Sequence, residues 1–148
     1  MAGPVPPRGM SELKESDALT LAGTMPVGRL AHVQSEQLSV VPVNFLLDGR
    51  DVLMRTAGDA ELLGAARRGA AAALQVDDLV EWSRSGWSVL IRGRLTEVTD
   101  PASVECVLTG SLHAWAGAGR DHVVRLVGEQ VTGRRIEPGP GGTTVARL

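Results

Sequence analysis

The segment from Ser39 to Leu63 restricts the possible folds more than any other part of this sequence. Apolar residues alternate along 39–47, which is the period of a strand with one buried face. The Asp48-Gly49 pair that follows is a strong hairpin signal, because tight hairpin turns need residues that accept positive φ. A second apolar strand is expected over 51–56. The segment therefore predicts an antiparallel hairpin, whose first strand has one face made of Val41, Val43, Phe45 and Leu47.

The second strand of this hairpin ends in Arg55 and Thr56, just before an expected helix. Asp59 is a suitable N-cap for that helix, which should run to about Arg68 and stop at Gly69. A guanidinium, a hydroxyl group and free helix N–H groups can together receive an anion such as a phosphate. The sequence therefore predicts an anion site at this corner.

The remaining elements are short helices and strands. Helices are expected from residue 11 or 16 to 22 and from Asp100-Pro101 to about 109, with Asp100 as the N-cap. A bulge or a bend is expected at Gly93. Strands joined by hairpin turns, with three short helices between them, predict a mainly β fold: an antiparallel barrel with small helices at its ends. Besides the hairpin, the expected strands are 27–33, 70–76, 86–98, 122–127 and 131–136.

The length of 148 residues and the apolar content of 43% fit one domain, expected over 11–136 between a disordered tail at 1–10 and a flexible tail at 137–148. The net charge of −2 is not the basic excess typical of nucleic-acid binders. No apolar run is long enough to cross a bilayer, and the first residues contain no signal-peptide core. A cytoplasmic protein without nucleic-acid or membrane partners is therefore expected.

Known catalytic motifs are absent from the sequence. It lacks the Gly-rich dinucleotide fingerprint, the P-loop and a serine nucleophile elbow, and it has no tyrosine. Its three histidines lack metal-ligand spacing and are expected at the surface or at caps, and the single cysteine, Cys106, is expected to be a small buried hydrophobe. Asp77, Asp78 and Glu81 are expected in a solvated loop. We therefore predict no catalytic side chain and no metal site, and a function that depends on a cofactor or on binding alone.

Six short stretches, in this order and spacing, resemble the actinobacterial branch of the pyridoxamine 5′-phosphate oxidase-like proteins. They are VGRLA at 27–31, VVPVNFLLDG at 40–49, MRTAG at 54–58, LQVDD at 74–78, SGWSVLIRGR at 85–94, and DHVVRL followed by VTGRR between 121 and 135. The resemblance spans about residues 11–136. It implies a six-stranded antiparallel split β-barrel of the FMN-binding type that forms a homodimer. FMN, or the deazaflavin F420, would lie in a groove at the dimer interface.

The resemblance also implies the positions that bind the cofactor. Val43 and Asn44 would contact the flavin ring, and Arg55 and Thr56 would bind its phosphate. Trp87 and Ser88 would lie near the cofactor, either in the same subunit or reaching in from the partner. The positions that complete the implied phosphate site are Ala60, Glu61 and Leu62.

Glu61 departs from the family pattern, which has a lysine here that closes on the phosphate. Exchanging a cation for an anion at about 4 Å from a phosphate costs on the order of a few kcal/mol, or about a hundredfold in affinity. Arg67 and Arg68, further along the same expected helix, are the cations that could compensate.

Three functions follow as alternatives. The first is an FMN-binding, flavin-dependent oxidoreductase of unknown substrate. The second is an F420-dependent reductase, whose long anionic cofactor tail would need a basic groove. The third is a cofactor-free split-barrel dimer with a binding or structural role, which Glu61 favours. The arginines that could line the basic groove are Arg92, Arg94, Arg134 and Arg135.

Overall fold

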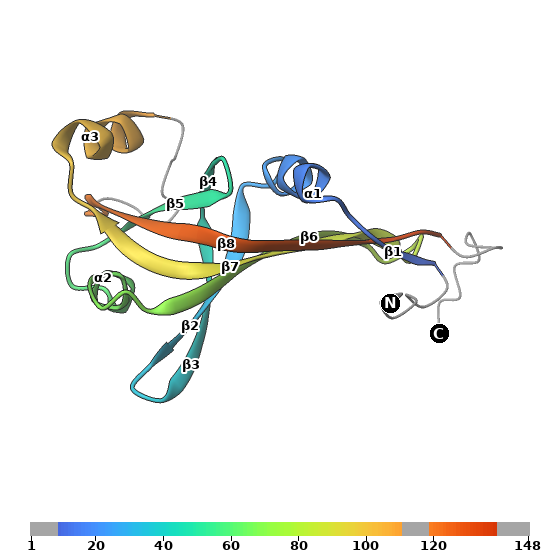
Figure 1. Cartoon of the computed structure of the whole chain (residues 1–148), viewed down its shortest axis with the longest axis horizontal. Helices are drawn as coiled ribbons and strands as arrows, with labels where there is room; N and C mark the ends of the chain where they lie inside the picture. The colour runs from blue at the N-terminus through green and yellow to red at the C-terminus, as the bar shows by residue number, and fades with distance from the viewer. Residues whose placement is uncertain (1–8, 111–118, 139–148) are drawn as a thin grey trace.

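One antiparallel sheet forms most of the molecule (Figure 1). The computed structural model describes residues 9–110 and 119–138. In these ranges the sheet has eight strands, in the order β3-β2-β6-β7-β8-β5-β4, with β1 paired to β8. They are β1 (Met10–Glu12), β2 (Val27–Gln34), β3 (Gln37–Asn44), β4 (Leu46–Asp48), β5 (Asp51–Thr56), β6 (Ala71–Val80), β7 (Ser85–Val98) and β8 (His122–Ile136). Because β1 and β4 have only three residues each, six longer strands remain, and the predicted fold class is confirmed.

The two edges of the sheet are consecutive in the chain. β3 forms one edge and β4 the other, and only Phe45 separates them. A sheet whose edges are joined by one residue has to curl until those edges approach, and this curling produces the barrel. The single strand expected over 39–47 is therefore two strands, because its first part pairs with β2 and its last part with β5.

Three helices lie on this sheet within the described residues: α1 (Glu15–Ala22), α2 (Glu61–Arg67) and α3 (Pro101–Thr109). α2 and α3 lie at one end of the molecule, and α1 lies nearer the other, against β7 and β8 (Figure 1). Asp100 caps α3 as predicted, because its carboxylate accepts hydrogen bonds from the backbone N–H of Ser103 at 3.0 Å and from the Ser103 hydroxyl at 2.7 Å. The predicted Asp59 cap is wrong: the N-cap of α2 is Ala60, which makes no side-chain hydrogen bond.

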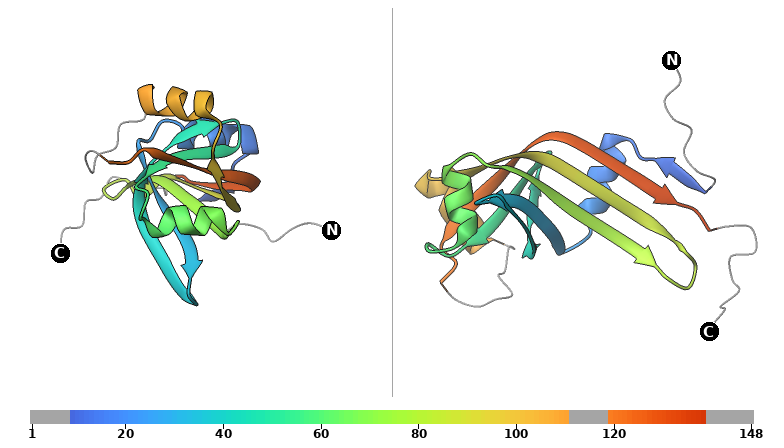
Figure 2. Two further views of the ribbon diagram at one scale, coloured as in Figure 1. Left: turned by 90° about the vertical axis from the view of Figure 1, so that its left-hand side faces the viewer. Right: turned by 90° about the horizontal axis from the view of Figure 1, so that it is seen from below.

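β6, β7 and β8 are the longest strands and extend together beyond the barrel (Figure 2). The two strands expected over 122–127 and 131–136 are one continuous strand, because β8 pairs with β7 from Val123 to Ile136, interrupted only at Glu129. The predicted irregularity at Gly93 is confirmed: Arg92 pairs with Gln130 and Gly93 with Gly128, so Glu129 is the extra residue.

The two faces of β7 differ in burial. The apolar face is buried in the core and consists of Trp87, Val89, Ile91 and Leu95. The opposite face carries exposed side chains such as Arg92 and Arg94. The acidic loop predicted at Asp77 and Asp78 is wrong, because both residues belong to β6 and pair with Ser88 and Trp87.

The β4–β5 hairpin turns one residue later than predicted. Asp48 pairs with Asp51, so the two turn residues are Gly49 and Arg50. Gly49 has a φ of 61°. A positive φ at the first turn position is the requirement of a type II′ turn, which glycine meets without strain.

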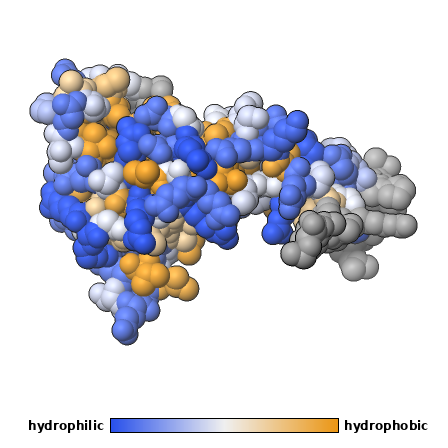
Figure 3. All heavy atoms as spheres, in the orientation of Figure 1, coloured by the Kyte–Doolittle hydropathy of each residue, from blue (hydrophilic) through white to orange (hydrophobic). Residues whose placement is uncertain are grey.

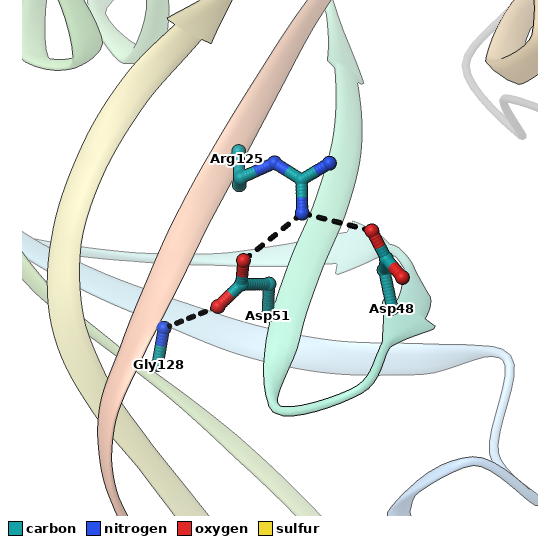
Figure 4. A network of polar contacts seen from close by, with 4 residues as sticks. All are labelled: Asp48, Asp51, Arg125 and Gly128. Carbon is teal, nitrogen blue, oxygen red and sulfur yellow. Dashed lines mark hydrogen bonds and ion pairs between the residues drawn. The ribbon is translucent and has the colours of Figure 1, made fainter. Parts of the chain in front are cut away.

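Arg125 of β8 holds this hairpin against the sheet (Figure 4). Its Nη1 atom lies 3.0 Å from an oxygen of Asp48 and 3.0 Å from an oxygen of Asp51. The other Asp51 oxygen accepts a hydrogen bond from the backbone N–H of Gly128 at 2.9 Å. These contacts fix the start of β5 on β8.

No helix in residues 9–110 and 119–138 is long and apolar enough to cross a bilayer.

The structure also tests what the sequence predicted for Met10 and Cys106. Met10, expected in the N-terminal tail, begins β1 because it pairs with Ile136. Most of the two tails, and residues 111–118, lie outside the described residues. Cys106 is exposed rather than buried, because Val107 is the residue of this helical turn that reaches the core.

Candidate functional site

A cavity of about 470 Å³ lies between the β2–β3 hairpin and the corner where β5 leads into α2. Its size is in the range of roughly 300–1,000 Å³ that is common for small-molecule sites. The cavity gathers seven of the nine positions that the sequence implicated in cofactor binding. They are Val43, Asn44, Arg55, Thr56, Ala60, Glu61 and Leu62.

The polar part of the cavity is at the end of β5. Arg55 is half-buried there, and its Nε atom donates a hydrogen bond to the backbone oxygen of Arg120 at 3.0 Å. Thr56 is only 2% exposed. Arg120 itself lines the cavity, because the pairing of Thr56 with His122 brings the residues before β8 to this corner. The corner is therefore lined by two arginines and a threonine.

Arg120 was not identified from the sequence as a site residue. It lies in the segment just before β8, 65 positions away from Arg55. The sequence around it shows only a basic residue at the end of the Gly-rich stretch 110–120, which by itself does not indicate a binding site. The register of β5 on β8, which no local pattern predicts, decides that Arg120 reaches the cavity.

Glu61 is the first residue of α2, and it is exposed at the edge of the cavity. The chain enters the helix through Ala60, which has extended backbone angles of −73° and 148°. In the described residues no ion pair involves Glu61. Glu61, which stands where the family pattern has a lysine, therefore lies at the implied phosphate site.

The inner face of the β2–β3 hairpin forms the apolar wall. Register pairs Leu30 with Val41 and His32 with Ser39, so these residues share the face that points toward the core. Val41 and Val43 line the cavity from this face. An apolar wall opposite a cationic corner suits a ligand with a flat apolar part and an anionic end.

His32 also lines the cavity and is 4% exposed. Its Nδ1 atom is buried and has no hydrogen-bond partner among the described residues. The expectation of a surface or capping histidine is wrong for this residue. Position 32 follows Leu30 on the buried face of β2, and the alternation of the strand turns the imidazole inward.

Asn44 lines the cavity where β3 ends. Its Nδ2 atom donates a hydrogen bond to the backbone oxygen of Pro26 at 3.3 Å. Asn44 also pairs with Val27 in the β2–β3 ladder, so this contact links the end of β3 to the residue just before β2.

Trp87 and Ser88 are not at this cavity. Trp87 is 7% exposed and belongs to the core. Ser88 is on the opposite face of β7 and lines a second cavity of about 660 Å³ with Gln75, whose Nε2 atom lies 3.4 Å from the Ser88 Oγ atom. The fold of one chain therefore separates these two residues from the other seven.

The arginines considered for an F420 tail do not gather at the first cavity. Arg94 donates to the backbone oxygen of Gly69 at 3.2 Å, and Arg92 donates to Gln130 at 3.3 Å. Arg92 and Arg134 both line the second cavity. In the part of the chain that the structure describes, none of the four arginines lines the first cavity with Arg55.

The far end of α2 is held by an ion pair. Arg67 donates to Glu97 from Nε at 3.0 Å and from Nη2 at 3.3 Å. The hydrogen bond from Arg67 lowers the pKa of Glu97 below its ordinary value, and His122 Nδ1 lies 3.5 Å from the same carboxylate. The pair fixes α2 on β7, so that Glu61 and Leu62 remain at the cavity.

No group of three or more metal-binding side chains occurs in the residues that the structure describes.

Comparison with known proteins identifies what this chain is similar to. The sequence profile of the family described as pyridoxamine 5′-phosphate oxidase matches residues 14–135. The chain is 37% identical over 140 residues to the uncharacterized protein Rv0080 of Mycobacterium tuberculosis, and the match covers 91% of each chain.

Two solved structures are similar in fold and sequence. An FAD binding protein from Mycobacterium smegmatis is 27% identical, with a TM-score of 0.66 over 86% of this chain and 99% of the other. A conserved protein of unknown function from Corynebacterium diphtheriae is 28% identical, with a TM-score of 0.71 over 86% of this chain and 98% of the other.

Proposed function

The chain belongs to the pyridoxamine 5′-phosphate oxidase-like family, and on that premise we propose that it is a flavin-binding protein that holds FMN in the cavity at the β5–α2 corner. The observation that supports this proposal is the convergence of seven implied cofactor residues on one cavity. The similarity to an FAD binding protein from Mycobacterium smegmatis supports a flavin as the ligand class.

The chemistry of the cavity fits a flavin mononucleotide. Arg55, Arg120 and Thr56 line one corner, where their guanidinium and hydroxyl groups would suit a single phosphate. Val41 and Val43 present apolar surface on the facing wall, which suits a flat ring system. The arrangement is polar at one end and apolar along its length, as the two parts of FMN require.

A bound flavin supplies redox chemistry that amino-acid side chains cannot provide. The residues of this chain would hold and orient it: the corner of Arg55 and Thr56 fixes the phosphate, and the β2–β3 wall excludes water from the ring. We therefore propose an oxidoreductase function in which the protein contributes position and environment.

We also propose that the protein is a homodimer. Apolar side chains are exposed on the outer face of the β2–β3 hairpin: Val33 at 50%, Leu38 at 81% and Val40 at 62%. This hairpin projects from the barrel, and hydrophobic residues gather on it (Figure 3). A second copy that covered this face would remove the apolar surface from water.

The decisive experiment is the visible absorption spectrum of the purified protein, followed by fluorescence titration with FMN, FAD and F420. We expect saturable binding that is tightest for FMN. A colourless protein that binds none of the three would contradict the proposal. Light scattering tests the dimer, which should have twice the 15.5 kDa mass of the chain; a monomer would contradict it.

A cofactor-free dimer with a binding role is the second candidate. The observation that favours it is Glu61, an acidic side chain at the edge of the implied phosphate site. It predicts a dimer by light scattering together with no binding in any flavin titration, and this combination separates the two functions.

A further inference from the structure

We infer that Arg120 is the second phosphate-binding cation of the β5–α2 cavity, in the role that a lysine at position 61 would have. This inference rests on the proposed function, because the phosphate belongs to the proposed flavin. The observation behind it is that Arg120 lines the same cavity as Arg55, Thr56 and Glu61.

The position of Arg120 is fixed by its own backbone. Its carbonyl oxygen accepts the hydrogen bond from Arg55 Nε at 3.0 Å, so the two arginines are held side by side. The antiparallel pairing of β5 with β8 begins two residues after Arg120, where Thr56 pairs with His122 and Arg55 pairs with Val123. The backbone of Arg120 is therefore anchored at the corner by the strand ladder as well as by Arg55, and this places its side chain at the cavity.

Charge at the corner favours a phosphate once Arg120 is included. With Arg55 alone, the opposite charge of Glu61 would leave the corner neutral. Arg120 adds one positive charge, so the corner as a whole attracts a group that carries close to two negative charges. Half-burial of both arginines strengthens this attraction over that of fully solvated groups.

Arg67 and Arg68, the compensating cations expected from the sequence, do not take this role. Arg67 is committed to Glu97, at the opposite end of α2 from the cavity. Arg68 is exposed and does not line the cavity. Among the described residues that line it, Arg55 and Arg120 are the arginines, and no lysine occurs after Lys14.

The test compares FMN with riboflavin, which has the same ring but no phosphate. We expect Arg120→Gln to weaken FMN binding about tenfold to a hundredfold, as the loss of one hydrogen-bonded charge implies, and to leave riboflavin binding unchanged. Arg68→Gln is the matched control and should alter neither affinity. Arg120→Lys should restore part of the FMN affinity, and the salt dependence of FMN binding should be shallower in Arg120→Gln than in the unmodified protein.

The outcomes separate this inference from the proposed function. If the unmodified protein binds FMN and riboflavin equally well, flavin binding stands and the phosphate role of Arg120 is overturned. The inference is also overturned if Arg120→Gln loses the same affinity for both ligands, or loses affinity for neither. Circular dichroism shows whether the variant is folded. If neither ligand binds the unmodified protein, the proposed function fails and the inference fails with it.

Discussion

Gly93 of β7 and Val127 of β8 approach so closely that a Cβ atom at position 93 would overlap the Val127 carbonyl oxygen. The approach occurs at the bulge formed by Glu129, where the long β7–β8 ladder changes register. A backbone oxygen cannot move aside as a side-chain end can. We therefore expect Gly93→Ala to lower the free energy of unfolding by about 2 kcal/mol or more.

The matched control for this prediction is Gly64→Ala in α2. The nearest atom to a Cβ at position 64 is Arg68 Nη1 at 3.6 Å, an ordinary contact. Alanine in a helix interior should stabilise the protein by about 0.5–1 kcal/mol. Urea unfolding of both variants measures the two effects, and equal stability of the two variants would contradict the close approach at Gly93.

The Asp51 carboxylate joins two strands, since it contacts Arg125 at 3.0 Å and accepts from the Gly128 N–H at 2.9 Å. We expect Asp51→Ala to cost about 2 kcal/mol, because it leaves a half-buried guanidinium and a backbone N–H without this partner. Asp48→Ala, which removes a largely exposed carboxylate from the same arginine, should cost less than about 1 kcal/mol. Thermal or urea unfolding measures both. The network in Figure 4 is wrong if Asp48→Ala costs more than Asp51→Ala.

Stability below about pH 4 should report on the α3 cap. Hydrogen bonds from the Ser103 hydroxyl and backbone N–H lower the pKa of Asp100 from its ordinary value of 3.8. The folded protein therefore binds this proton less readily than the unfolded chain, so the cap stabilises above the unfolded pKa and is lost as pH falls through the folded pKa. Asp100→Ala should lower the urea midpoint at pH 7 and have a smaller effect at pH 2. A difference that does not depend on pH would show that the charge of Asp100 does not matter.

Glu61→Lys should raise FMN affinity about tenfold or more, because it replaces repulsion of the phosphate by attraction. Glu105→Lys makes the same charge change at an exposed position of α3 and should leave the affinity unaltered. Fluorescence titration measures both. Equal gains in the two variants would mean that net charge, and not position 61, controls binding.

His32→Phe should stabilise the ligand-free protein by about 1 kcal/mol. The Nδ1 atom of His32 is buried without a hydrogen-bond partner among the described residues, and an apolar ring of similar shape removes that cost. The cavity beside the ring leaves room for the added carbon atom. Chemical unfolding measures the change, and a clear loss of stability would show that the imidazole makes a hydrogen bond.

Much of the fold follows from local patterns. The alternation in β7, the bulge at Gly93 and the Asp100 cap of α3 all involve residues close in sequence, whose preferences act over a few positions. The errors occur where distant segments compete for the same residues. β3 and β4 divide one apolar stretch because each part has a different partner strand, and β8 unites two stretches because β7 is long enough to pair with both.

The candidate site divides in the same way. The sequence alone marked Arg55 and Thr56 as an anion corner, because the charge and hydroxyl stand at a strand end before a helix. It could not identify Arg120 or His32. Arg120 reaches the corner through the register of β5 on β8, and His32 faces inward through the pairing of β2 with β3 and β6.

The sequence by itself therefore determined the class of fold, most strand positions and one half of the polar corner, since these depend on neighbours along the chain. Only the tertiary structure decided that Phe45 joins the two edges of the curled sheet, that Trp87 and Ser88 lie away from the cavity, and that Arg120 lines the cavity with Arg55 and Glu61. The physical reason is that backbone pairing between distant strands fixes which side chains meet, and a shift of one residue in that pairing would send each side chain to the other face.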